Sequence, residues 1–370
     1  MRLLTRIFAS LASGAVLVAA QPAQAVAQQS GDRQRAVAAD AALQGRFYSK
    51  ATHLYVDSPA GSKGASAAAW SFSQAFAATL ALARLPEVPA RYRREVADRW
   101  HASAAYWDAV AQPPAYAARV TSSGGSDVAH FYDDNEWLGL DLLATSQLLG
   151  RTAALEQAER VFTVVRAAWD GNPTDSCPGG VFWTHWHGIV DRNTVSTANG
   201  ALLALRLYQV TGTALYLEWA ERMYVWVTTC LTRPDGLIAD HLRGDGSIDE
   251  HAWTYNQGAM VAAGALLYAV TGDRRFLKQA ESLAARAVAH FADFRGEPPI
   301  FVAIFFRDLQ TAAAIDKNSD DRTALQAYAD QAWNRDRLGP RSALFTFGRS
   351  PTILDQAAMV QIYATLAGSR

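Results

Sequence analysis

Cysteine is scarce in this 370-residue chain, which contains only Cys177 and Cys230. Two thiols are too few for a scaffold that depends on disulfides, and they exclude a metal site built from cysteines. A bond between them is possible in an oxidising compartment, but sequence alone does not place the two residues close together. The bonded and the free state are therefore both open at the level of sequence.

Net charge and long apolar runs are also missing. The formal net charge is −1, so the chain has no positive excess that would attract nucleic acid or an anionic membrane. The apolar stretch "IFASLASGAVLVAA" is too short for a membrane span. It follows Arg2 and Arg6 and precedes the small-residue motif "AQA", which is the order of a secretory signal peptide. We expect residues 1–25 to be cleaved near Ala25 for export and residues 26–45 to form a flexible lead-in.

The sequence shows no sustained alternation of strands and helices, which argues against a parallel α/β sheet. Abundant alanine favours helix. Three glycines, Gly150, Gly212 and Gly272, each follow an apolar run and precede an amphipathic segment with similar Leu and Ala-Glu positions. This repeat of about 60 residues predicts a buried helix, a tight glycine turn and an exposed helix in each unit.

Helical hairpins of this kind stack side by side, and the chain has room for about six of them. Six hairpins would close into an all-α (α/α)6 barrel, with one ring of helices inside another. An open solenoid is the competing architecture, but the sequence lacks the shorter regular period typical of such arrays. We therefore expect one (α/α)6 domain over residues 46–370.

Three segments that precede buried helices are rich in polar and aromatic residues: "HFYDDNEW", "GIVDRNTVSTANG" and "HAWTYNQG". Because they occupy similar places in their repeats, they should meet at one mouth of the barrel. Asp133 and Asp134 in the first segment could simply cap a helix. A carboxyl pair is also the equipment of a glycoside hydrolase, and consecutive residues would hold their carboxyls roughly 5 Å apart, as in a retaining enzyme. Mutual repulsion would then keep one carboxyl protonated.

The same segments supply side chains that can stack on sugar rings or bond to hydroxyls. Asn199 before a glycine can equally be a turn residue, and Asn256 can equally cap a helix. His185 and His187 suggest a metal pair, but no third ligand has a recognisable spacing, so we expect no metal. The candidate sugar-binding residues are Asn135, Trp137, Trp183, Arg192, Asn193, Asn199, Tyr255, Asn256 and Gln257.

The blocks "YDDNEWLGLDLL", "CPGGVFW", "RNTVSTANGALLALRLYQVTG" and "TYNQGAMVAAGALLYAVTGD" resemble glycoside hydrolase family 76, from about Tyr48 to the C-terminus. That family contains endo-α-1,6-mannanases and related fungal cell-wall enzymes. The resemblance implies an (α/α)6 barrel and retaining hydrolysis of α-1,6-mannosidic bonds, with Asp133 as nucleophile and Asp134 as acid/base. It also marks Asp240 as an acidic position near the cleft. A monomer without a cofactor, acting on α-mannan or a related α-linked glycan, is expected.

This chain departs from the family pattern in segments that would contact the substrate. The family often has Lys-Asn where this chain has Arg192-Asn193, and commonly Asp-Gly where it has Asp240-His241. These changes leave the chemistry intact and put the identity of the glycan in doubt. Two alternative hypotheses for the function are a sugar epimerase or unsaturated-uronyl hydrolase on a similar barrel, and a glycan-binding protein without catalysis.

Overall fold

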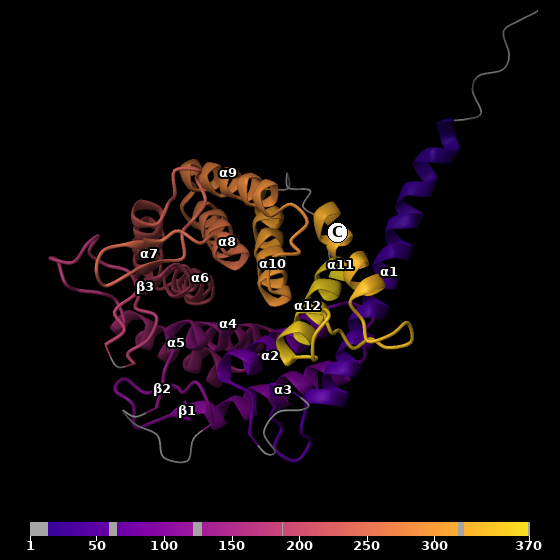
Figure 1. The fold of residues 1–370 in the computed structure, drawn as a ribbon, viewed down its shortest axis with the longest axis horizontal. Helices are drawn as coiled ribbons and strands as arrows, with labels where there is room; N and C mark the ends of the chain where they lie inside the picture. The colour runs from indigo at the N-terminus through magenta and orange to yellow at the C-terminus, as the bar shows by residue number, and fades with distance from the viewer. Residues whose placement is uncertain (1–13, 59–64, 121–127, 187, 317–321, 369–370) are drawn as a thin grey trace, which may run out of the picture.

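The computed structural model describes residues 14–58, 65–120, 128–186, 188–316 and 322–368. Within these residues six helices form an inner ring and six an outer ring (Figure 1). The inner helices are α2 (Ala69–Ala83), α4 (Tyr132–Leu149), α6 (Thr194–Thr211), α8 (Thr254–Thr271), α10 (Pro299–Asp316) and α12 (Ile353–Gly368). The outer helices are α1 (Gly14–Phe47), α3 (Arg91–Ser103), α5 (Thr152–Ala167), α7 (Ala214–Cys230), α9 (Arg274–Phe291) and α11 (Arg322–Arg335).

The inner helices close a complete ring. Each contacts the next in chain order, and α12 returns to contact α2. Two side chains of α12 join it to the first helices of the chain: Gln356 donates to the carbonyl of Ala39 in α1 at 2.7 Å, and Gln361 donates to that of Gln74 in α2 at 3.0 Å. The predicted (α/α)6 barrel is confirmed, and the open solenoid is excluded.

The three predicted glycine turns are present between inner and outer helices. Gly150, Gly212 and Gly272 follow α4, α6 and α8 with φ angles of 68°, 70° and 75°. This left-handed conformation suits glycine, and each glycine N–H caps the preceding helix by bonding to a carbonyl four residues earlier. The repeat read from the sequence is therefore the hairpin of the barrel.

The expectation of a flexible lead-in over residues 26–45 is corrected by the structure, because that segment lies within helix α1. Ala36, Ala39, Leu43 and Phe47 are buried, and α1 packs along α12. Their spacing of three and four residues places them on one face of the helix. The folded unit therefore begins before residue 46.

A side chain in the first turn of four inner helices fastens the loop that precedes the helix. Asn135 and Gln257 each bond to both the N–H and the carbonyl of one loop residue, Tyr116 and Ile238 respectively. Thr197 accepts from the N–H of Val181, and Gln356 from that of Phe345. All four occupy the fourth position of their helices, which are α4, α8, α6 and α12 in that order. These bonds hold the loops at the mouth of the barrel.

Short antiparallel strands add further order to the loops. The strands are β1 (Trp107–Asp108), β2 (Ala115–Tyr116), β3 (Arg192–Asn193), β4 (His241–Leu242) and β5 (Ile248–Asp249). A two-stranded sheet pairs β1 with β2. In a second, larger sheet β3 pairs with β4 and β4 with β5, and the register sets Asn193 opposite His241. The larger sheet brings the loop before α6 beside the loop before α8.

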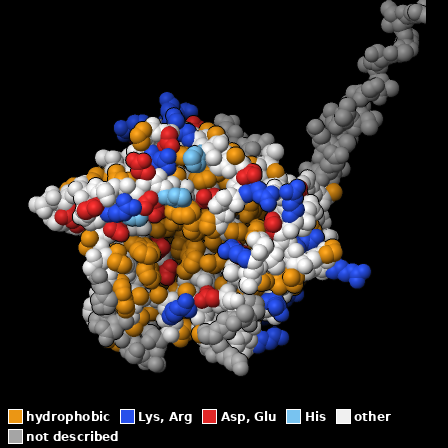
Figure 2. All heavy atoms as spheres, in the orientation of Figure 1, with side chains coloured by type: hydrophobic (Ala, Val, Ile, Leu, Met, Phe, Trp, Pro, Cys, Tyr) orange, Lys and Arg blue, Asp and Glu red, His pale blue; other side chains and the backbone are white. Residues whose placement is uncertain are grey.

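Cys177 and Cys230 form a disulfide that joins the loop before β3 to the end of α7. The sequence allowed both the disulfide-bonded and the free state of these cysteines, and the structure has the bonded state. No helix of the described ranges is both long and apolar enough to cross a membrane. The face shown in Figure 2 is hollowed near its centre, where hydrophobic side chains gather between charged ones.

Candidate active site

A cavity of about 490 Å³ lies at the end of the barrel where the inner helices begin. Its walls come from five inner helices and from the β3–β4 sheet. The lining residues are Trp70, Phe131, Asp133, Asp134, Trp137, Trp183, Asp191, Asn193, Val195, Asp240, His241, Tyr255 and Phe301. The predicted meeting of the three polar segments at one mouth is therefore observed.

Asp133 and Asp134 occupy the first turn of α4 and both face this cavity. Neither caps the helix, because its N-cap is Phe131 and has no side-chain bond. Burial raises the pKa of both carboxyls. Bonds from the backbone N–H of Asp134 and from the side chain of Trp183 act against burial at Asp133, lowering its pKa, whereas nearby Asp240 raises it.

Asp134 has a different environment. Burial is the largest cause of its raised pKa, and the neighbouring charge of Asp133 adds to it. Hydrogen-bond donors thus favour the charged form of Asp133, while everything acting on Asp134 favours the protonated form. The pKa of both carboxyls is thus raised, but only Asp133 has donors that act against the rise. Such a difference between adjacent carboxyls is expected of a nucleophile and an acid.

A third carboxyl, Asp240, faces the pair from the loop before β4. Its Oδ1 accepts from Nδ2 of Asn256 at 3.0 Å, and its Oδ2 lies 2.9 Å from Nδ1 of His241. The hydrogen bond to Asp240 is the main cause of the raised pKa of His241. Asn256 is itself fully buried, so it positions Asp240.

Aromatic rings form much of the cavity wall. Trp70 of α2 and Trp137 of α4 lie 5.6 Å apart between ring centroids, and Phe131 and Trp183 lie 4.9 Å apart. Tyr255 of α8 completes the wall beside Phe301. Aromatic faces combined with polar groups at a concave site suit ligands with apolar faces and hydroxyl rims, such as sugars.

The structure divides the residues predicted from sequence into two groups. Those that line the cavity are Asp133, Asp134, Trp137, Trp183, Asn193, Asp240 and Tyr255. Those that lie behind its wall are Asn135, Arg192, Asn199, Asn256 and Gln257. The second group is a correction, because none of these five residues lines the cavity and all are at most 2% exposed.

The reason for this correction is visible in their partners. Asn135 and Gln257 are saturated by backbone groups of the preceding loops. The Arg192 guanidinium bonds to the carboxylate of Asp170 at 2.7 Å and to three loop carbonyls. Asn199 lies inside α6 with no exposed surface. Polar residues close to an active-site motif in sequence thus build the wall behind it.

Sequence reasoning did not assign Trp70, Asp191, His241 and Phe301 to the site. Trp70 and Phe301 lie near the starts of α2 and α10, in hairpins without the glycine signature. Their position near the start of an inner helix is equivalent to that of the predicted site residues, and this equivalence is the signal that could have identified them. His241 was noticed only as a departure from the family pattern, and its contact with Asp240 gives it a place in the cavity.

The histidine pair considered as a metal site does not assemble one in the described residues, where no cluster of three metal-binding side chains occurs. His187 lies outside the described residues. Nε2 of His185 lies 3.4 Å from Nδ1 of His130, whose Nε2 is 3.2 Å from Asp108. These contacts fasten the segment that carries Trp183.

Glu136 is a buried carboxyl just beneath the aspartate pair. It has no exposed surface, and neither of its oxygens has a hydrogen-bond partner among the described residues. Gly200 lies close by, and a Cβ added to this glycine would be 3.2 Å from Oε1 of Glu136. Burial, followed by the charge of Asp133, raises its pKa well above 4.5. The folded protein therefore holds this proton more tightly than the unfolded chain does, and the free energy of unfolding falls as pH rises between the two pKa values.

Glu136→Gln should remove this part of the pH dependence. We expect the variant to lose less stability than the wild type between about pH 5 and about pH 8, measured by urea unfolding at both values. Glu156→Gln, on the exposed face of α5, is the control and should follow the wild type. An unchanged pH slope for Glu136→Gln would mean that Glu136 ionises normally in the fold.

Comparison with known proteins places this geometry in context. The model of glycosyl hydrolase family 76 matches residues 33–349. Mannan endo-1,6-alpha-mannosidase DCW1 of Candida albicans is 32% identical over 191 residues, and its counterpart in Saccharomyces cerevisiae is 33% identical over 173. The matches cover 46% and 38% of this chain and 40% and 37% of those proteins. The chain thus spans well under half the length of these relatives.

Solved structures share the fold. A family 76 glycoside hydrolase from a bovine Bacteroides thetaiotaomicron strain superposes with a TM-score of 0.81 at 23% identity, covering 91% of this chain and 77% of that one. An inactive variant of the α-1,6-mannanase GH76A of Salegentibacter sp. HEL1_6, with two aspartates replaced by asparagine, is bound to α-1,6-mannotriose. It gives a TM-score of 0.73 at 19% identity, covering 91% and 99% of the two chains.

Proposed function

Because the chain belongs to glycoside hydrolase family 76, we propose that it hydrolyses α-1,6-mannosidic bonds in α-mannan with retention of configuration. The observation that carries this proposal is the pair Asp133 and Asp134, side by side in an aromatic cavity at the mouth of the barrel. The names of the matched relatives, which are mannan endo-1,6-alpha-mannosidases, support the choice of substrate. Asp240 supports a polar subsite beside the pair.

In the proposed first step, Asp133 attacks the anomeric carbon while Asp134 gives its proton to the departing glycosidic oxygen. The bond to the leaving sugar breaks as the bond to Asp133 forms, so Asp133 loses its negative charge. That charge helps to hold the proton on Asp134. Its loss allows Asp134 to remain ionised and to take a proton from water in the second step. Water then attacks the anomeric carbon and releases Asp133.

The decisive experiment is incubation with linear α-1,6-mannan, reading the products by NMR as they form. The proposal expects new reducing ends that first carry the α configuration. Products that first appear as β anomers would indicate inversion instead. A change in sugar configuration without new reducing ends would favour an epimerase, and binding without turnover would favour a glycan-binding protein.

We also propose that the protein is exported after cleavage near Ala25. The support is the order of charged, apolar and small residues at the N-terminus, together with the disulfide, which persists in oxidising compartments. Cleavage there would leave intact the part of α1 that packs on α12. N-terminal sequencing of protein recovered outside the cytoplasm tests this, and a mature chain that begins at Met1 would refute it.

A further inference from the structure

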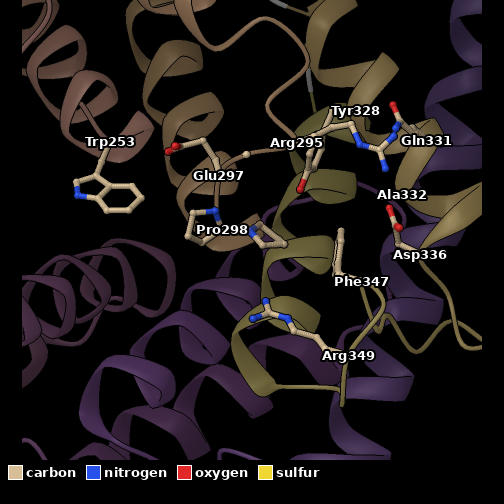
Figure 3. A pocket seen from close by; sticks show the side chains of 12 residues that line it. Trp253, Arg295, Glu297, Pro298, Tyr328, Gln331, Ala332, Asp336, Phe347 and Arg349 are labelled. Carbon is tan, nitrogen blue, oxygen red and sulfur yellow. The ribbon is translucent and has the colours of Figure 1, made fainter. Parts of the chain in front are cut away.

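A second cavity, of about 430 Å³, lies at the same end of the barrel, and Figure 3 shows the side chains that line it. It lies between the starts of α8 and α10 on one side and α11 with the following loop on the other. Trp253 stands on one side, and Gln331 and Asp336 face it from the other (Figure 3). None of the residues lining this cavity lines the catalytic cavity.

Aromatic rings connect the two cavities. Phe301, which lines the catalytic cavity, has its ring centroid 4.1 Å from that of Tyr255 in the same cavity. The ring centroid of Phe301 also lies 5.4 Å from that of Trp253, which lines the second cavity. The three rings therefore form a continuous strip from the aspartate pair toward the second cavity. A chain of sugar rings can stack along such a strip without leaving the protein surface.

The chemistry of the second cavity suits a neutral polyhydroxylated ligand. Its charged lining residues are Arg295 and Arg349 against Glu297 and Asp336, so the two signs balance. An anionic ligand would gain no net attraction from that balance. Guanidinium, carboxylate and amide groups beside aromatic rings offer both donors and acceptors to hydroxyls.

The walls of this cavity are fastened to the barrel. Oε2 of Glu297 accepts from both the backbone N–H and the hydroxyl of Thr254, at 2.9 and 2.8 Å, which ties the α9–α10 loop to the start of α8. On the opposite side, the carbonyl of Asp336 accepts from the N–H of Thr346 at 2.7 Å. A site held in this way is formed before the ligand arrives, which lowers the cost of binding.

We propose that the second cavity is a distal sugar-binding subsite that receives the continuing chain of a long α-linked mannan whose scissile bond lies over Asp133 and Asp134. The inference rests on the proposed function and adds that polymer length is sensed through Trp253, Arg295 and Gln331. Long chains gain contacts that short oligosaccharides do not reach.

The test compares α-1,6-mannotriose with long linear α-1,6-mannan. The variants are Trp253→Ala and the double variant Arg295→Ala with Gln331→Ala. We expect kcat/KM on the polymer to fall by about tenfold for each, mainly through KM, which is the loss expected for one or two sugar contacts. The ratio of polymer to trisaccharide kcat/KM should fall by a similar factor. Arg275→Ala, at an arginine with 86% exposed side chain on α9, is the control and should leave the ratio unchanged.

The outcomes separate the two proposals. If the wild type cleaves neither substrate, the proposed function fails. Suppose instead that the wild type cleaves both substrates. The distal subsite is then wrong if the variants keep normal kcat/KM on both substrates, or if their kcat/KM falls by the same factor on both. Trp253→Phe guards against a folding defect, because it keeps an aromatic ring next to the start of α8 and should recover most of the polymer activity.

Discussion

Replacing Asp133 or Asp134 by Asn is expected to lower kcat on α-1,6-mannan by about a thousandfold or more, with the fold intact. Asn has nearly the shape of Asp but can neither attack the anomeric carbon nor exchange a proton in this pH range. Because burial raises the pKa of both carboxyls, neutral replacements should not cost stability at neutral pH. Activity and urea unfolding measured on the same samples check both halves of the expectation.

The two variants should also differ from each other. With an activated aryl leaving group, which departs without a proton, Asp134→Asn should still form the glycosyl-enzyme, and azide should then restore turnover with a retained α-azide product. Asp133→Asn lacks the nucleophile, so azide should give the inverted β-azide. Swapped products would exchange the assigned roles, and near-normal activity of either variant would remove that aspartate from the mechanism.

The same helix provides a matched control. Asp141 is also a buried carboxyl of α4, and burial raises its pKa as well, but it lies outside the catalytic cavity. Asp141→Asn should therefore keep its activity within about twofold of the wild type. A large loss of activity in this variant would show that neutralising any buried carboxyl of α4 impairs the enzyme. The losses at Asp133 and Asp134 would then no longer indicate catalytic roles.

Arg192→Ala is expected to lower the free energy of unfolding by about 3–5 kcal/mol, because it leaves the buried carboxylate of Asp170 without its partner. Both side chains are at most 3% exposed, so water cannot replace the guanidinium. The variant also loses bonds to loop carbonyls near the disulfide. In the folded protein, KM for mannan should change little, since Arg192 does not reach the cavity.

Arg243→Ala is the control for this stability change. Its partner is Asp249, and both side chains are about a third exposed or more, so the loss should stay below about 1 kcal/mol. Equal losses for the two arginine variants would mean that burial of the Arg192 pair contributes little. A raised KM with normal stability for Arg192→Ala would instead restore Arg192 to the substrate site.

The sequence was sufficient for the architecture because the hairpin repeat has a local signature. The turns at Gly150, Gly212 and Gly272 need a residue that tolerates positive φ, and glycine reveals them. The aspartate pair was visible for a similar reason, as its charge is conspicuous at the start of an apolar helix. Helix α1 was missed because its alanines, which pack against α12, carry little signal in a polar, glycine-containing stretch.

The site was only partly predictable because a polar side chain at a helix start has two possible directions. Asn135 and Asp134 are neighbours in sequence, yet one turns back to the backbone of β2 and the other faces the cavity. The choice depends on where the preceding loop runs, which is tertiary information. Trp70 and Phe301 join the cavity across the closed ring from distant parts of the chain, so their role depends on that closure.

The bond from Gln356 to Ala39 also bears on how the protein is made. The first and last helices of the barrel are neighbours, separated by almost the whole chain. While the ribosome is still synthesising α12, the inner helices α2 and α10 each lack a partner, and apolar surface stays uncovered. The ring of inner helices can thus close only after α12 has been synthesised, and until then this apolar surface of α2 and α10 stays uncovered.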